Sequence, residues 1–582
     1  MNNATEVNDL GFEKLPLYQP RQFLPNMIDL GRMSEIKPFF DALINQKINS
    51  SADLERWLLN RCELEGALDQ FGSILYIRMT CQTDNQKFAT DYQKFIEEIV
   101  PGVKPLEDAL NRKFLNDLNQ YPLDKSRYSL YVRALKADVD LFVEKNIPLQ
   151  TKLDLLSQEY QTLCGAMMVQ WEGKEMTLPQ VGKFLHENDR VVREKAWKVM
   201  AARRLQEKDK LDTLFTEMVG LRHQVALNAG CANHCDYKFR SLHRFDYTPE
   251  DCKQYHRSAE KYIVPLWQEI LEKRRQAMRL KDLRPWDTAV DPQGLVPLKP
   301  FKDVEELVSK CQQIFNTIDH ELGAQFQEVS NLGLLDLNSR KGKAPGGYQS
   351  MLNESRKPFI FMNAVGLDGD VRTLLHEAGH AFHSLACCKD PLLHYRHGPM
   401  EFNEVASMAM EMLAGEHLQS FYGADDFKRS QKNHFEDIVF TLVWVATIDA
   451  FQHWIYENPF HSAGQRREAW LSIRKRFGGD GVNWEGLEDE HAYLWHRQLH
   501  VFEYPFYYIE YGIAQLGALQ LWQNARKDFN QAIKDYKRGL ALGGSKPLPE
   551  LYAQAGIKFD FSENTIAPLM AAVKAELASY EA

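Results

Sequence analysis

The sequence predicts a mainly α-helical protein of more than one lobe, with a small β-sheet near residues 345 to 363. The chain has 582 residues, more than a single hydrophobic core usually accommodates. Strand-like signal is confined to "KAPGGYQSMLN" and "KPFIFMNAVG", which are bounded by Pro, Gly and Asn. Helical periodicity runs through most of the rest. One apolar helical face consists of Leu211, Leu214, Phe215, Met218, Leu221 and Val225.

The chain is expected to divide into an N-terminal helical lobe, residues 1–200, and a catalytic lobe, residues 201–582. A patch with four prolines at 281–300, "KDLRPWDTAVDPQGLVPLKP", either separates lobes or forms a long functional loop. Residues 33 to 230 contain hardly any alternating strand pattern, and no fixed-period repeat stands out.

Composition indicates a soluble protein of a reducing compartment, which we expect to be the cytoplasm. The residues are 44% apolar and 26% charged, and the net charge of -10 argues against a nucleic-acid partner. The N-terminus does not resemble a secretory signal. The most apolar stretch, 438–448, is shorter than the about 20 residues that span a bilayer, so we expect a buried core helix and no membrane. Nine scattered cysteines do not suggest a disulfide framework.

A candidate metal site lies in "LDGDVRTLLHEAGHAFHSLACC", which follows the expected strands and has a helical apolar stripe. Asp368 or Asp370 is the expected N-cap. His376 and His380 are four residues apart, so both imidazoles project from one helical face and can share an ion. Glu377 is placed to take a proton from a metal-activated water.

The third ligand must come from elsewhere, because Ala386 and His383 occupy the places that a later histidine and a glycine would need. Glu404, in "NEVAS", is the favoured candidate on a second helix, and Glu401 and Glu411 are alternatives. We interpret Glu401 as a solvated loop carboxylate. Glu411 lies two helical turns beyond Glu404 and can instead orient a ligand histidine by accepting a hydrogen bond from it.

Other histidines and cysteines are interpreted as structural. His383 is a structural histidine, and the thiols of Cys387 and Cys388 are expected to be buried. "CANHC", from Cys231 to Cys235, lacks a second Cys/His pair at zinc-finger spacing. His394 and His397 are expected to face solvent from a loop.

A second cluster offers hydrogen-bond donors for a developing oxyanion. The stretch "QLHVFEYPFYYIEYGIAQLGALQLW" is expected to be helical from Pro505, with Tyr504, Tyr508 and Tyr511 on one face. Phenols and the imidazole of His500 can donate to such an oxyanion, whereas an aromatic core helix is the alternative.

Together "HEAGHAFH", "NEVAS" and "FEYPFYYIEYGIAQLGALQLW" resemble the thimet oligopeptidase and oligoendopeptidase F family of zinc peptidases. The likeness is strongest to the bacterial oligoendopeptidase F and Pz-peptidase branch. It is clear from about 343 to 522 and looser over the whole length. The resemblance implies two helical lobes around a deep substrate channel, and a zincin-like catalytic region with a small sheet beside the zinc helices.

The resemblance also implies site residues. They are His376, His380 and Glu404 for one Zn²⁺ per chain, Glu377 as general base, and His500, Tyr508 and Tyr511 for substrate or oxyanion contact. Tyr504 is expected to contact substrate as well. "GGYQ", with Gly346, Gly347 and Tyr348, matches a strand that pairs with the substrate backbone. Gln349 stands where relatives often carry cysteine, which leaves thiol-dependent regulation open.

The expected function is hydrolysis of internal bonds in short, unstructured peptides by a zinc metalloendopeptidase. A peptide-binding protein without catalysis and a zinc hydrolase of non-peptide amides are the alternatives. Short oligopeptides are the expected partners, and the chain is expected to be a monomer or a homodimer.

Overall fold

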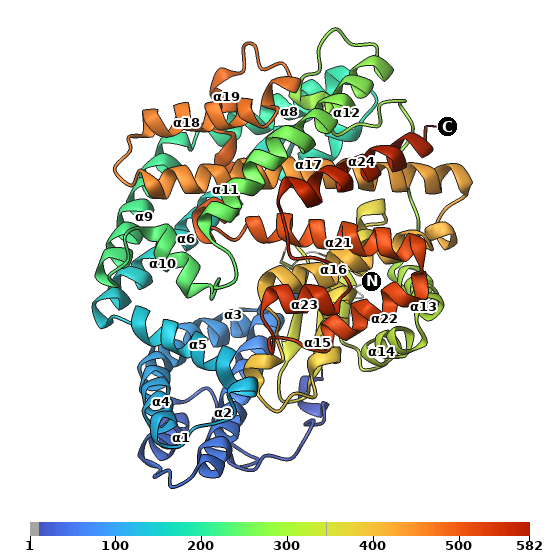
Figure 1. Cartoon of the computed structure of the whole chain (residues 1–582). Helices are drawn as coiled ribbons and strands as arrows, with labels where there is room; N and C mark the ends of the chain where they lie inside the picture. The colour runs from blue at the N-terminus through green and yellow to red at the C-terminus, as the bar shows by residue number, and fades with distance from the viewer. Residues whose placement is uncertain (1–10, 341, 345, 582) are drawn as a thin grey trace, which may run out of the picture. The chain divides into compact units, whose positions relative to one another are not determined.

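The computed structural model describes residues 11–340, 342–344 and 346–581 (Figure 1). The chain folds into two compact units, each built from three segments that are distant in sequence. Unit 1 comprises the chain up to Val139, Lys299–Phe427 and Gly517–Phe559, and unit 2 comprises Asp140–Leu298, Lys428–Leu516 and Asp560–Ala582. The boundary at Leu298 falls inside the proline-rich patch. The simpler division near residue 200 stays a prediction.

Unit 1 contains most of the N-terminal helices and both helices of the candidate metal site. Its first core packs around Trp57, whose ring stacks on Phe114 with centroids 6.1 Å apart and whose indole N–H donates to the carbonyl of Leu43. Helix α2 begins after Ser50, whose side chain accepts from the backbone N–H of Asp53 and so caps the helix. The helices are α1 (Met33–Asn45), α2 (Ser51–Cys81), α3 (Gln86–Lys94), α4 (Val100–Gln120), α5 (Lys125–Leu141), α13 (Val304–Ile318), α14 (His320–Asn331), α15 (Asp368–Cys387), α16 (Met400–Gly415), α22 (Phe529–Leu540) and α23 (Leu548–Gln554).

A three-stranded sheet of unit 1 has the order β3-β5-β4. Strand β3 (Leu335–Asn338) runs parallel to β5 (Lys357–Ala364), and β4 (Tyr348–Leu352) runs antiparallel to β5 with Tyr348 opposite Phe361. The two strands predicted near residues 345 to 363 are therefore confirmed. Strand β4 lies at the edge of this sheet.

Helix α15 follows the sheet, as the sequence predicts. Its N-cap is Leu367, and Asp368 is already the first helical residue. The prediction that Asp368 or Asp370 is the N-cap is therefore wrong. Asp370 nevertheless contributes to capping, because it accepts from the backbone N–H groups of Val365, Gly366 and Leu367 at 2.8–2.9 Å. A carboxylate in the third helical position that reaches back in this way satisfies donors that would otherwise be unpaired.

Unit 2 is also mainly helical. Helix α9 (Lys208–Asn228) buries Leu211, Phe215 and Met218, so the predicted helical face is confirmed. The other elements are α6 (Ile147–Gly165), β1 (Met168–Trp171), β2 (Lys174–Thr177), α7 (Leu178–Gly182), α8 (Arg190–Leu205), α10 (His234–Ser241), α11 (Pro249–Ser258), α12 (Val264–Ala277), α17 (Ala424–Glu457), α18 (Ala463–Arg476), α19 (Glu488–Ala492), α20 (Leu499–Glu503) and α24 (Glu563–Ser579). Helix α21 (Ile509–Lys527) contributes residues to both units.

Three expectations about the positions of strands and helices are wrong. The β1–β2 hairpin lies in the region expected to lack strands, and its turn places both Glu172 and Gly173 at positive φ. Strand β3 likewise precedes the segment to which strand signal was confined. The helix expected from Pro505 begins only at Ile509, because Phe506 has φ 63 and interrupts it.

Helix α17 contains the apolar stretch 438–448. By length and composition it could cross a membrane, but 83% of its most apolar window is buried inside the protein. It is therefore packed as a core helix, as expected.

Candidate metal centre and catalytic site

Two of the candidate metal ligands are histidines on α15. His376 and His380 are one helical turn apart, and their ring centroids lie 4.9 Å from each other at an interplanar angle of 83°. Helix α15 also packs on strand β5, which fixes the helix against the sheet. The predicted pair of imidazoles is thus brought to one place.

Helix α16 places the carboxylate of Glu404 beside both histidines. Its Oε2 lies 3.5 Å from Nε2 of His376 and 3.8 Å from Nε2 of His380. The candidate donor atoms of these three residues all lie within 4.8 Å of one another. These separations suit atoms that share one ion, and Glu404 itself is only 5% exposed.

Gly379 makes the approach of the two helices possible. A β-carbon on this residue would lie 2.5 Å from the carbonyl oxygen of Ala406 and 2.6 Å from the Cα of Ser407. No real β-carbon tolerates such contacts with backbone atoms. The glycine inside the "HEAGH" motif therefore lets α16 come close enough for Glu404 to reach the histidines.

Glu411 hydrogen-bonds to the nitrogen of His376 that does not face the other donors. Its Oε1 lies 2.7 Å from Nδ1 of His376, which leaves Nε2 directed to the donor cluster. An acceptor of this kind fixes the tautomer and the orientation of a ligand imidazole. This geometry agrees with the interpretation of Glu411 as the residue that orients a ligand histidine.

Glu377 is buried beside the cluster and has an unused oxygen. Its side chain is 6% exposed, and its Oε2 makes no hydrogen bond within the described part of the chain. Burial raises the pKa of this carboxyl to about 7. A carboxylate with such a pKa can accept and then release a proton near neutral pH.

The glycine pair that precedes β4 lies directly beside this carboxylate. A β-carbon on Gly347 would be 3.5 Å from Oε1 of Glu377, and both Gly346 and Gly347 are exposed. The ring of Tyr348 stacks on Phe361 with centroids 4.7 Å apart, and its hydroxyl lies 2.6 Å from Oγ1 of Thr80. Tyr348 therefore anchors the strand to α2, a contribution of the N-terminal helices that the sequence did not reveal.

The predicted tyrosine cluster forms within unit 2. The ring centroid of His500 lies 4.9 Å from that of Tyr508 and 6.0 Å from that of Tyr511, and the two tyrosine rings are 5.5 Å apart. Gln498 contacts Nδ1 of His500 at 3.0 Å. Tyr504 is 52% exposed and precedes the helix. The side chains gather around His500 although the helix begins later than predicted.

One interpretation of a nearby carboxylate is corrected. Glu401 is not a solvated loop residue, because α16 begins at Met400 and buries its side chain. It also lies outside the three-residue donor cluster.

The other histidines and cysteines take mostly the expected positions. His383, Cys387 and Cys388 are buried, and His394 and His397 are exposed. Burial lowers the pKa of His383 to about 3, which keeps this imidazole neutral. Cys231, His234 and Cys235 are buried around the start of α10, and the absence of a metal role there stays a prediction.

The donor set fits a catalytic transition-metal site. Two imidazoles and one carboxylate leave a coordination position open for water or substrate, which is the usual arrangement for catalytic zinc. The orphaned oxygen of Glu377 suits a proton acceptor for that water.

The comparisons with known proteins agree with this geometry. The profile of peptidase family M3 matches residues 183–570, and that of the peptidase M3 N-terminal domain matches residues 30–142. This chain belongs to peptidase family M3. Members of this family are generally metal-dependent, which agrees with the cluster of donors on α15 and α16.

Individual M3 relatives share both sequence and fold with this chain. A solved structure of Pz peptidase A with an inhibitor is 26% identical, with a TM-score of 0.88 over 96% of this chain and 99% of the other. An oligoendopeptidase F homolog of Borreliella burgdorferi is 25% identical over 302 residues, 50% of this chain and 49% of the relative. Oligopeptidase PepF of Bacillus subtilis is 27% identical over 44% of this chain and 38% of the relative. The chain thus spans about half the length of these two curated relatives, or less.

Proposed function

We propose that this M3 peptidase is a zinc-dependent oligopeptidase that hydrolyses internal bonds of short, unstructured peptides. The observation that carries the proposal is the convergence of His376, His380 and Glu404 beside the buried carboxylate of Glu377. The likeness to Pz peptidase A and to oligoendopeptidase F supports peptides as the substrates.

The proposed chemistry divides between the metal and the chain. One zinc ion per chain, held by His376, His380 and Glu404, would supply an activated water and polarise the scissile carbonyl. Glu377 takes a proton from the attacking water and returns it to the leaving amine. Glu411 keeps His376 in the tautomer that presents Nε2.

Substrate contacts are proposed for two further groups. Gly346 and Gly347 precede the edge strand that begins at Tyr348, and the backbone of this segment can pair with an extended peptide. His500, Tyr508 and Tyr511 would donate to substrate or to the developing oxyanion, and Tyr504 would contact substrate. This assignment rests on the resemblance, and the clustering of the rings around His500 supports it.

A reducing compartment suits the cysteines. All nine are free thiols, and most are buried. Because disulfides are rare in the cytosol, we propose a cytoplasmic location.

A metal-removal experiment tests the proposal. Chelation should abolish cleavage of short peptides, and one equivalent of zinc per chain should restore it. Activity that survives complete metal removal contradicts the zinc mechanism. If the zinc-loaded protein binds peptides but does not cleave them, the chain is a binding protein. If it hydrolyses only non-peptide amides, the substrate class is wrong.

A further inference from the structure

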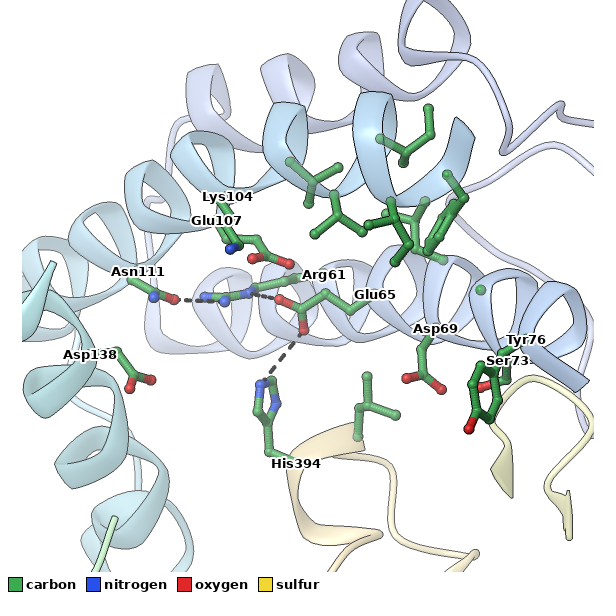
Figure 2. A pocket seen from close by; sticks show the side chains of 18 of the residues that line it. Arg61, Glu65, Asp69, Ser73, Tyr76, Lys104, Glu107, Asn111, Asp138 and His394 are labelled. Carbon is green, nitrogen blue, oxygen red and sulfur yellow. Dashed lines mark hydrogen bonds and ion pairs between the residues drawn. The ribbon is translucent and has the colours of Figure 1, made fainter. Parts of the chain in front are cut away.

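A pocket of about 660 Å³ lies within unit 1 (Figure 2), and none of the three metal donors lines it. Helix α2 forms one wall, and the turn Phe95–Ile99 with the start of α4 forms another. Ser350 of β4 and His394 of the short helix Leu393–Tyr395 close the remaining side. None of these residues has a role in the chemistry described above.

One wall of the pocket is apolar and partly open to solvent. Ile96 is 39% exposed, and Tyr76 is 38% exposed. Gly72 of α2 allows the wall to form, because a β-carbon there would lie 2.7 Å from the ring of Phe95. The apolar side chains that line this part are Leu68, Phe95, Ile96, Ile99, Val100 and Val103. This wall is suited to the aliphatic part of a ligand.

The opposite part of the pocket is acidic. Figure 2 shows carboxylates on α2, α4 and α5 around the same space. Four carboxylates line the pocket against two cationic side chains: Glu65, Asp69, Glu107 and Asp138 against Arg61 and Lys104. The lining therefore has an excess of two negative charges when all six groups are ionised.

The buried cation of Arg61 is paired with a carboxylate of the pocket, although its Nη1 makes no hydrogen bond with the described residues. Arg61 is almost completely buried, and its Nε lies 2.7 Å from Oε1 of Glu65. Its Nη2 donates to Oδ1 of Asn111 at 2.7 Å. Lys104, in contrast, is exposed. The acidic excess therefore comes from the other carboxylates of the pocket.

Two of the carboxylates lack full compensation. Only one oxygen of Glu65 is paired with Arg61; the second is buried without a hydrogen bond in the described part of the chain, and Nε2 of His394 lies 3.8 Å from it. Burial, reinforced by the charge of Glu65, raises the pKa of Glu107 to about 7. A cation in the pocket would stabilise both groups in their charged forms.

Strand β4 connects this pocket with the metal centre. Gly347 lies beside Glu377, whereas Ser350, three residues further along the strand, lines the pocket. Three residues of extended chain span about 10 Å. A peptide paired with the outer edge of β4 would thus carry a side chain or terminus to the pocket about three residues from the bond that is cut.

We propose that this pocket binds a positively charged group of the peptide substrate, about three residues from the scissile bond, with the apolar wall holding the aliphatic stem. The group is a lysine or arginine side chain or the N-terminal ammonium, since each presents the same charge and donors. The inference rests on the proposed peptidase function and names a substrate preference of that site.

A series of quenched fluorescent peptides tests the inference. Each peptide carries lysine or its neutral counterpart norleucine at successive positions on either side of one cleavable bond. Each is made with a free and with an acetylated N-terminus, which separates the side chain from the ammonium. We expect kcat/KM to favour lysine over norleucine by about fivefold at one position near the third residue, because a partly exposed ion pair contributes up to about 1 kcal/mol. If kcat/KM instead falls on acetylation of the N-terminus and does not depend on lysine, the pocket binds the ammonium.

Variants locate the preference in the pocket. In Glu107→Gln and in Asp69→Asn the ratio of the two kcat/KM values should fall towards one. Glu98→Gln is the matched control. Glu98 is exposed and lies outside the pocket, and its substitution removes one negative charge from the segment beside the pocket. An equal loss of the ratio in this control would show a general charge effect and would overturn the assignment.

Binding to Glu377→Gln measures the same preference without turnover. Fluorescence anisotropy should give a lower Kd for the lysine peptide than for the norleucine peptide, and raised salt should reduce the difference. Equal affinities, or a preference for glutamate at that position, overturn the proposed cation site.

If peptides are cleaved without any preference for charge, the cation site is wrong and the peptidase function stands. If no peptide is cleaved while the lysine preference in binding persists, the peptidase function is wrong and the cation site stands.

Discussion

Gly379 and Ser407 hold the two metal-site helices in contact: a β-carbon on Gly379 would lie 2.6 Å from the Cα of Ser407. The carboxylate of Glu404 reaches His376 and His380 only because α15 and α16 pack at this distance. The glycine of the "HEAGH" motif is thus as important for the shape of the site as its histidines.

Gly379→Ala should weaken metal binding and lower the stability of the fold. The methyl group forces the helices apart, and overpacking of this kind costs about 1–3 kcal/mol. Zinc titration and thermal unfolding measure the two effects. Gly369→Ala in the same helix is the matched control, because nothing lies within 4 Å of a β-carbon there. Equal metal affinity in both variants would show that close packing does not place Glu404.

Glu404→Gln should lower zinc occupancy, whereas Glu401→Gln should retain it. Both residues are buried in α16, but only Glu404 lies within reach of both histidines. Metal content after dialysis, measured by elemental analysis, compares the two variants. Loss of zinc from the Glu401 variant alone would reassign the third ligand.

Glu411→Gln should lower zinc affinity by about 10- to 100-fold, as loss of the acceptor behind a ligand histidine usually does. The carboxylate holds Nδ1 of His376 at 2.7 Å, and an amide supports that tautomer less strongly. Competition with a chromogenic chelator gives the affinity. Unchanged affinity would mean that this hydrogen bond does not orient the ligand.

Tyr508→Phe or Tyr511→Phe should reduce kcat by about 10²–10³, the usual cost of one oxyanion donor. The change removes a hydroxyl and keeps the ring packing around His500. Steady-state kinetics should show the loss mainly in kcat. Tyr128→Phe is a control for the loss of a buried tyrosine hydroxyl, because that group lies on α5 and donates to Glu55 of α2. A loss in KM alone for the site tyrosines would make them binding residues.

Local patterns predicted the parts of the site that depend on local geometry. The spacing of His376 and His380 was sufficient because helical periodicity alone puts them on one face. The strands β4 and β5 were predicted because Pro, Gly and Asn bound a short β-prone run. Glu404 was the favoured ligand among three carboxylates, and the structure places it in the donor cluster.

Other features depend on interactions that local patterns do not contain. Glu401 was taken as solvated because the start of α16 at Met400 could not be located from the sequence. The helix near Pro505 starts late because Phe506 adopts a left-handed conformation that favours other residue types. The β1–β2 hairpin was missed because its turn, Glu172-Gly173, lacks the Asn-Gly or Asp-Gly pair that marks a two-residue hairpin, although both residues adopt positive φ. The grouping of three distant segments into each unit follows from long-range packing alone.

Digestion of a mixed-length peptide pool, read by mass spectrometry, tests the central claim most directly. The zinc-loaded protein is compared with Glu377→Gln, which should keep its metal because Glu377 is not among the three donors. We predict internal cuts in short peptides by the intact protein and almost none by the variant. An intact pool with both proteins, while both hold zinc, would contradict the peptidase function; equal cutting by both would contradict the role of Glu377 as the base.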